Sequence, residues 1–130
     1  MMKYQSSALF LGTATLLLCA TPASAMGAKF SWAGIPACSG TSPAFSISGV
    51  PKGTVSLNFM MMDYNKPDYN HGGSTIAYKG GPVPRGAISY TGPCPPAGAV
   101  HRYIWTIKAL DESGKVLATA KAEGRFPAGK

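Results

Sequence analysis

The sequence predicts an all-β sandwich or barrel with little or no helix. Apolar and polar residues alternate over several short runs, which is the pattern of half-buried strands. The 130-residue chain contains 16 Gly and 11 Pro, and these residues separate the runs as turns. No internal repeat and no linker is visible, so we expect one domain.

The first 25 residues are predicted to be a cleaved secretory signal peptide. Lys3 supplies the basic start, residues 8–20 form an apolar run, and Ala23-Ser24-Ala25 is a small-residue cleavage site. The apolar run is too short to favour a membrane span. Cleavage leaves residues 26–130 as the mature domain, located in the periplasm or outside the cell, with no transmembrane segment.

The net charge is +7 for the whole chain and becomes +6 when Lys3 leaves with the signal peptide. A positive surface attracts anions such as phosphate, phospholipid headgroups or acidic glycans. The simplest interpretation of the charge alone is a soluble basic protein. The lysines are scattered singly, so the sequence gives nucleic-acid binding little support.

The first half of the mature domain contains three expected strands, at residues 29–32, 43–50 and 55–63. In the third strand Leu57, Phe59 and Met61 share one face, and Asp63 continues that face at its end. Met60 and Met62 lie on the opposite face, which suggests a strand covered on both sides.

The middle of the chain is expected to be rich in turns. We predict a loop over residues 64–73, because Pro67 and the Gly72-Gly73 pair disfavour regular structure. Short strands are expected at residues 74–78 and 87–91.

The most strongly β-prone stretch is residues 101–110. Alternation places His101, Tyr103 and Trp105 on one face with the apolar residues that follow. A last strand over residues 115–126 would pair with it across the turn at 111–114. Its Ala, Lys and Glu content would also suit a helix, but the turn favours a hairpin.

Polar side chains stand at the ends of two apolar faces. If the two strands run antiparallel, Asp63 and His101 meet at one edge. Two imidazoles, from His101 and from His71, can both donate to one phosphate oxygen, while Asp63 selects a tautomer. Tyr103 adds an aromatic wall and a hydroxyl, and Gly72 allows the backbone to approach a ligand closely.

Each of these residues also has a purely structural interpretation. A single histidine at a strand end is commonly structural or exposed, and Asp63 could cap the turn that follows it. The run of methionines at 60–62 is typical of core filling.

The cysteines predict one disulfide. Cys19 leaves with the signal peptide, so Cys38 and Cys94 remain in an exported domain. The bond would close a loop of about 56 residues and contribute about 4 kcal/mol in the chain-entropy model.

Two metal sites compete with an anion pocket. A copper centre needs two His, a Cys and usually a Met near the C-terminal end, yet Cys94 precedes His101 by seven residues and no Met follows residue 62. A zinc hydrolase could use His71, His101 and Asp63, but no H-E-x-x-H spacing is present. We therefore predict no metal, no cofactor and no enzymatic activity.

Two motifs resemble those of the phosphatidylethanolamine-binding proteins, also called Raf kinase inhibitor-like proteins. The segment D-Y-N-K-P at 63–67 is similar to their D-P-D-x-P motif. The segment G-P-C-P-P-A-G at 92–98, followed by H-R-Y at 101–103, is similar to G-P-x-P-P-x-G-x-H-R-Y. The resemblance extends from Phe30 to Pro127 and points to the small exported bacterial branch.

The resemblance implies an antiparallel β-sandwich with a small anion pocket at one end. It assigns to the pocket Asp63, His71, His101 and Tyr103, with Pro95 and Pro96 in its wall. The expected function is non-enzymatic binding of phosphate or a phospholipid headgroup. The alternative is a protein-interaction module, such as an inhibitor of a secreted hydrolase.

The chain departs from the family pattern in and near both motifs, and it also has a short loop before His71 and no C-terminal helix of the kind that eukaryotic members have. Asn65 replaces the second Asp of the first motif, so the ion pair with Arg102 is expected to be lost or moved to Asp68. Gly72 stands where the family usually has Trp, and one extra residue precedes His101. We therefore expect a wider and more open pocket, which would allow a ligand other than that of the family.

Overall fold

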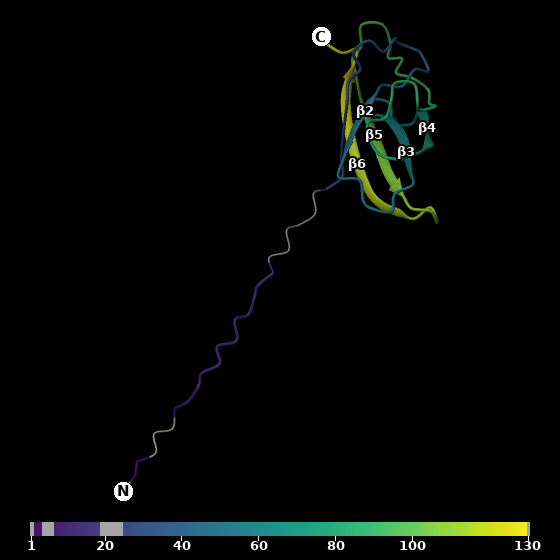
Figure 1. The fold of residues 1–130 in the computed structure, drawn as a ribbon. Helices are drawn as coiled ribbons and strands as arrows, with labels where there is room; N and C mark the ends of the chain where they lie inside the picture. Colours follow the sequence, from purple (N-terminus) through teal and green to yellow (C-terminus); the bar gives the residue numbers. More distant parts are fainter. Residues whose placement is uncertain (1, 4–6, 19–24, 130) are drawn as a thin grey trace.

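Two antiparallel sheets form the domain in the computed structural model, which describes residues 2–3, 7–18 and 25–129 (Figure 1). The larger sheet has the order β4-β3-β5-β6 and the smaller one pairs β1 with β2. The described residues contain no helix, so none could span a membrane, and the expected all-β class is confirmed. The strands are β1 (Gly27–Phe30), β2 (Phe45–Ser48), β3 (Ser56–Asp63), β4 (Asn70–Ala77), β5 (His101–Leu110) and β6 (Val116–Phe126).

The N-terminal segment at 7–18 has no regular secondary structure and extends away from the domain (Figure 1). Ala23 and Ser24 of the expected cleavage site, and Cys19, lie outside the described residues.

The core lies between the two sheets and is built on the central strands β3 and β5. The expected alternation is confirmed in both strands: Leu57 and Phe59 of β3 and Trp105 and Ile107 of β5 are completely buried. On the other face of β3, Met60 and Met62 are 43% and 41% exposed. The expectation that β3 is covered on both sides is therefore wrong, because the small sheet covers only the inner face.

The small sheet approaches β6 closely because the inner face of β6 carries small residues. Ala118, Ala120 and Ala122 point inward, and a Cβ at Gly124 would lie 3.1–3.2 Å from the rings of Phe30 and Trp32. The Trp32 indole N–H donates to the carbonyl of Gly124 at 3.4 Å. The β5–β6 pairing also confirms the C-terminal hairpin and excludes the helical alternative for residues 115–126.

The expected loop over residues 64–73 ends four residues early, because β4 begins at Asn70. The glycine pair forms a β-bulge: Met60 pairs with Gly73, whereas Met62 pairs with Asn70. Gly72 has a φ of +69°, and a Cβ at Gly73 would lie 1.7 Å from the carbonyl oxygen of Phe59. The two glycines therefore allow strand pairing that side chains would prevent.

The strand expected at 87–91 is absent from the structure. The segment is instead fixed by single hydrogen bonds, such as those from Ile88 N to Ser42 Oγ (3.0 Å) and from Thr91 N to His71 O (2.8 Å). The β-pairing in this region occurs earlier, where Val83 exchanges two 2.9 Å backbone hydrogen bonds with Phe45.

Candidate ligand-binding pocket

The last residue of β3 and the first residue of β5 meet at the end of the sandwich that carries the C-terminus in Figure 1. The register pairs Asp63 with Tyr103, so His101 lies just beyond the end of β3. The His101 Nδ1 and Asp63 Oδ2 atoms are 2.6 Å apart, with side chains only 16% and 5% exposed. Since a carboxylate accepts, Nδ1 carries the hydrogen and donates it.

The second oxygen of Asp63 holds the turn that follows β3. Oδ1 accepts hydrogen bonds from the backbone N–H groups of Asn65 (2.9 Å) and Lys66 (3.2 Å). The structural interpretation of Asp63, that it caps the turn after β3, is thus confirmed. Both oxygens of Asp63 therefore accept hydrogen bonds within the protein, and Oδ2 orients His101.

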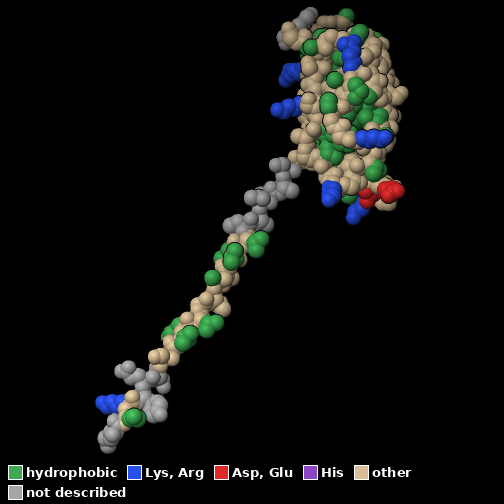
Figure 2. Space-filling view, in the orientation of Figure 1, with side chains coloured by type: hydrophobic (Ala, Val, Ile, Leu, Met, Phe, Trp, Pro, Cys, Tyr) green, Lys and Arg blue, Asp and Glu red, His purple; other side chains and the backbone are tan. Residues whose placement is uncertain are grey.

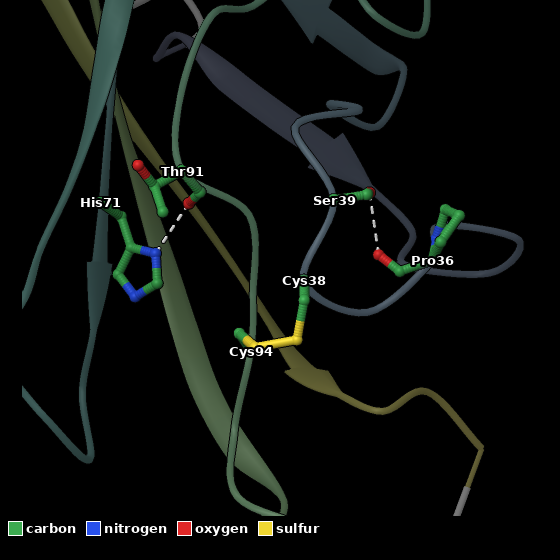
Figure 3. Close-up of a disulfide and its surroundings, with 6 residues drawn as sticks. All are labelled: Pro36, Cys38, Ser39, His71, Thr91 and Cys94. Atoms are coloured by element: carbon green, nitrogen blue, oxygen red, sulfur yellow. Dashed lines mark hydrogen bonds between the residues drawn. A yellow bond between two sulfur atoms is a disulfide. The ribbon is translucent and has the colours of Figure 1, made fainter.

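His71 is held in the same way by a different element. Its Nδ1 lies 2.7 Å from the carbonyl oxygen of Thr91, so Nδ1 again carries the hydrogen. The other ring nitrogen points away from Thr91 (Figure 3). The side chain is buried, and within the described part of the chain neither His71 nor His101 has a hydrogen-bond partner at Nε2.

Tyr103 lies between the two imidazoles. Its ring centroid is 5.5 Å from that of His71, edge to face, and 6.3 Å from that of His101. The residue is fully buried, and among the described residues its hydroxyl has no hydrogen-bond partner. Burial, and next the negative charge of Asp63, raise the pKa of Tyr103 well above its usual value. The phenol therefore remains a neutral donor.

These side chains surround a cavity of about 330 Å³. Its lining combines four predicted pocket residues and Pro96 with three residues not assigned to the pocket from sequence. The lining residues are Asp63, Lys66, Tyr69, His71, Cys94, Pro96, His101 and Tyr103.

Pro95 and Gly72 are outside this lining set: Pro95 precedes the lining residue Pro96, and Gly72 lies in the β4 bulge. Lys66 and Tyr69 belong to the loop between β3 and β4. Because this loop connects Asp63 to His71, it has to pass beside any pocket formed by the two, and that is the signal that could have identified them. The Tyr69 ring lies 4.7 Å from His71.

A disulfide between Cys38 and Cys94 fixes the proline-rich wall of the pocket (Figure 3). The Cys38 N–H donates to the carbonyl of Pro93 at 2.9 Å, and a Cβ at Gly92 would lie 1.7 Å from the carbonyl oxygen of Ser39. Two loops far apart in sequence are thus held in close contact. The Cys94 sulfur is committed to this bond, and within 25–129 no group of three His, Cys, Asp or Glu side chains is placed to hold a metal ion.

Arg102 forms no ion pair with residue 65, which is Asn here, or with Asp68. Its Nη2 pairs with Glu123 Oε2 at 3.2 Å, and its guanidinium lies 4.4 Å from the ring centre of Tyr64. The expected move to Asp68 is wrong, because Asp68 lies near Lys66 at 3.9 Å. Asn65 accepts the backbone N–H of Arg102 at 2.8 Å.

The pocket presents hydrogen-bond donors around a largely apolar floor. Nε2 of each imidazole, when protonated, the Tyr103 hydroxyl and the exposed Lys66 ammonium are all able to donate. An oxyanion is the ligand that such a set satisfies best. Lys and Arg elsewhere are spread singly over the visible face of the domain (Figure 2), so the surface forms no broad basic patch there.

Comparisons with known proteins agree with the fold. Residues 72–127 match the family model of the phosphatidylethanolamine-binding proteins, a range that contains the second motif but not the first. A solved homolog from Chlamydia trachomatis is similar over 81% of this chain and 99% of its own, with 24% identity and a TM-score of 0.62.

The Escherichia coli protein YbcL, described as a new member of the mammalian family, is similar over 67% of this chain and 80% of its own. Its sequence identity is 22% and its TM-score 0.52. These likenesses establish the fold. No curated protein matches the chain significantly.

Proposed function

We propose that the chain, whose residues 72–127 match the family model of the phosphatidylethanolamine-binding proteins, is an exported, non-enzymatic binding protein of that family. Its ligand is a small anion, either phosphate or the phosphate of a phospholipid headgroup. The ligand occupies the cavity between His71, His101 and Tyr103.

One observation carries the proposal: both imidazoles are tethered through Nδ1, which leaves Nε2 of each ring to bind a ligand. Beside them the buried Tyr103 hydroxyl has no acceptor among the described residues. A phosphate oxygen would accept from all three groups, which supports an anion rather than a cation or an apolar ligand.

Size and charge support the same ligand class. A cavity of about 330 Å³ is at the lower end of small-molecule sites, which suits a headgroup better than an acyl chain. Lys66 lies at the rim with 60% of its side chain exposed, so it can approach an anion from solution.

Two features support export. The N-terminal residues have the pattern of a signal peptide, and the Cys38–Cys94 disulfide suits an oxidising compartment. An exported location would give the pocket access to free phosphate or to lipid headgroups.

The test is a titration of the protein with phosphate and with phosphoethanolamine, followed by the NMR signals of the imidazoles. Both histidines should shift and saturate together. Binding should be stronger at mildly acidic pH than at alkaline pH, because a charged imidazole donates from both nitrogens.

Absence of a shift in either histidine at millimolar ligand would exclude the anion pocket. Phosphoester hydrolysis that disappears in His101→Ala would instead indicate an enzyme. Retention of a secreted protein that depends on the Lys66–Gly73 loop, without any ligand shift, would favour the interaction module.

A further inference from the structure

A second, smaller cavity lies behind the histidine pocket, on the outer face of the same strand ends. Its volume is about 150 Å³, and it is lined by Tyr64, Asn65, Val100, Arg102 and Arg125. We propose that this outer cavity binds a phosphate group through the two arginines, independently of the histidine pocket.

The alternation of β5 separates the two sites. His101 and Tyr103 point to the inner face, whereas Arg102 between them points outward. Residue 63 likewise lines the inner pocket and residue 64 the outer cavity. A ligand in one cavity therefore touches none of the side chains that line the other.

The outer cavity carries an excess of positive charge. Arg102 and Arg125 are directly paired across β5 and β6, an arrangement that repels unless an anion lies nearby. Glu123 pairs with Arg102, but along the described chain Arg125 makes no ion pair within 4.0 Å. One positive charge of the pair remains uncompensated.

Arg102 is already fixed in position. Its guanidinium lies against the Tyr64 ring, and its backbone N–H is held by the Asn65 side chain. Its buried Nε has no acceptor within the described residues. Because the Arg102 guanidinium is already held in place, it loses little conformational freedom when it binds an oxyanion.

The lining of this cavity contains no carboxylate. Asn65 places an amide there, so the lining itself adds no negative charge, and Glu123 pairs with Arg102 alone. Guanidinium groups bind phosphate oxygens in bidentate fashion, and the small volume suits one phosphate group. Tyr64 and Val100, 57% and 37% exposed, would flank the organic part of a monoester.

The test follows the Arg102 and Val100 backbone amides and the arginine Nε–H signals by NMR while the full domain is titrated with inorganic phosphate. The variants are Arg125→Gln and, as a matched control, Lys121→Gln, which removes the same charge from another exposed position of β6. The apparent affinity at the outer cavity should fall about tenfold in Arg125→Gln, the effect of one charge-assisted hydrogen bond. It should stay unchanged in Lys121→Gln.

The histidine signals keep the two proposals separate, because their response to phosphate should be the same in Arg125→Gln as in the unaltered protein. A second arm replaces phosphate by phosphatidylcholine vesicles with and without phosphatidic acid. A response to phosphate alone identifies a free anion as the ligand, and a response to phosphatidic acid alone identifies a lipid headgroup.

The proposal is overturned if the outer signals respond in neither arm, or if Lys121→Gln weakens binding as much as Arg125→Gln. The second result would mean that diffuse charge attracts the anion. Because Arg125 is exposed, both variants should fold, and a thermal unfolding curve for each checks this.

Discussion

At the scale of single residues, the pocket is defined by how its two histidines are oriented. His101 donates its Nδ1 hydrogen to the carboxylate of Asp63, and His71 donates its Nδ1 hydrogen to the backbone carbonyl of Thr91. The first contact was predictable from alternation, since antiparallel pairing brings the strand ends together. The second was not, because Thr91 lies in a segment without regular secondary structure.

Tyr103→Phe separates ligand binding from stability. The hydroxyl it removes has no partner in the described chain, so the free energy of unfolding should stay the same or rise. Phosphate affinity, measured by calorimetry, should fall about tenfold, because one donor to the ligand is lost. An unchanged affinity would remove Tyr103 from the site.

Tyr90→Phe is the matched control. The Tyr90 hydroxyl donates to the Thr41 carbonyl at 3.0 Å, away from the pocket lining. This variant should lose about 1 kcal/mol of stability and keep its phosphate affinity.

The same two variants test the dependence of stability on alkaline pH. Burial raises the pKa of Tyr90 to about 12, and burial and Asp63 raise that of Tyr103 further. Only the unfolded chain ionises these phenols just above pH 10, so stability is full below pH 10 and falls as pH rises beyond it. Each Phe variant should show a shallower fall in urea unfolding.

At the scale of elements, β4 shows where pattern rules fail. A pair of glycines usually indicates a loop, yet here it lies inside a strand. The reason is the close approach of the Phe59 carbonyl, which only a residue without a side chain permits at position 73. Such an approach depends on a partner strand far away in sequence, so local composition does not reveal it.

Gly73→Ala should destabilise the protein far more than Gly72→Ala. The first Cβ would overlap the Phe59 oxygen, at a cost on the order of 3 kcal/mol or more. A Cβ at Gly72 would have no atom within 4 Å, so Gly72→Ala costs only the strain of a positive φ, about 1–2 kcal/mol of stability. Urea unfolding of both variants measures the difference, and equal losses would contradict the bulge geometry.

At the scale of the whole molecule, the disulfide joins the loop that carries Cys38 to the loop that lines one wall of the pocket. Replacing both partners, Cys38→Ser with Cys94→Ser, should cost about 2–5 kcal/mol of stability. Phosphate affinity should fall as well, because Cys94 and Pro96 line the cavity. Urea unfolding and calorimetry under oxidising conditions check both, and retained affinity would show that the wall is stable without the bond.

The sequence predicts the whole architecture well wherever strands are long and alternate clearly. The bounds of β3, β5 and β6 lie within one residue of those expected, because each has one buried face. The short strand at 27–30 is displaced from the expected 29–32, because four residues carry little periodicity. The Arg102–Glu123 pair was not foreseen, since it depends on the β5–β6 register rather than on a motif.

The bulge in β4 also affects how copies of the protein meet. β4 forms an edge of the larger sheet, and a sheet edge can pair with a strand from another molecule, although the Thr91 N–H already donates to the His71 carbonyl there. At Gly72 and Gly73 the backbone turns out of the regular ladder, so an incoming flat strand cannot pair with it continuously. The bulge that follows His71 therefore makes this edge a poorer template for pairing with another copy of the protein.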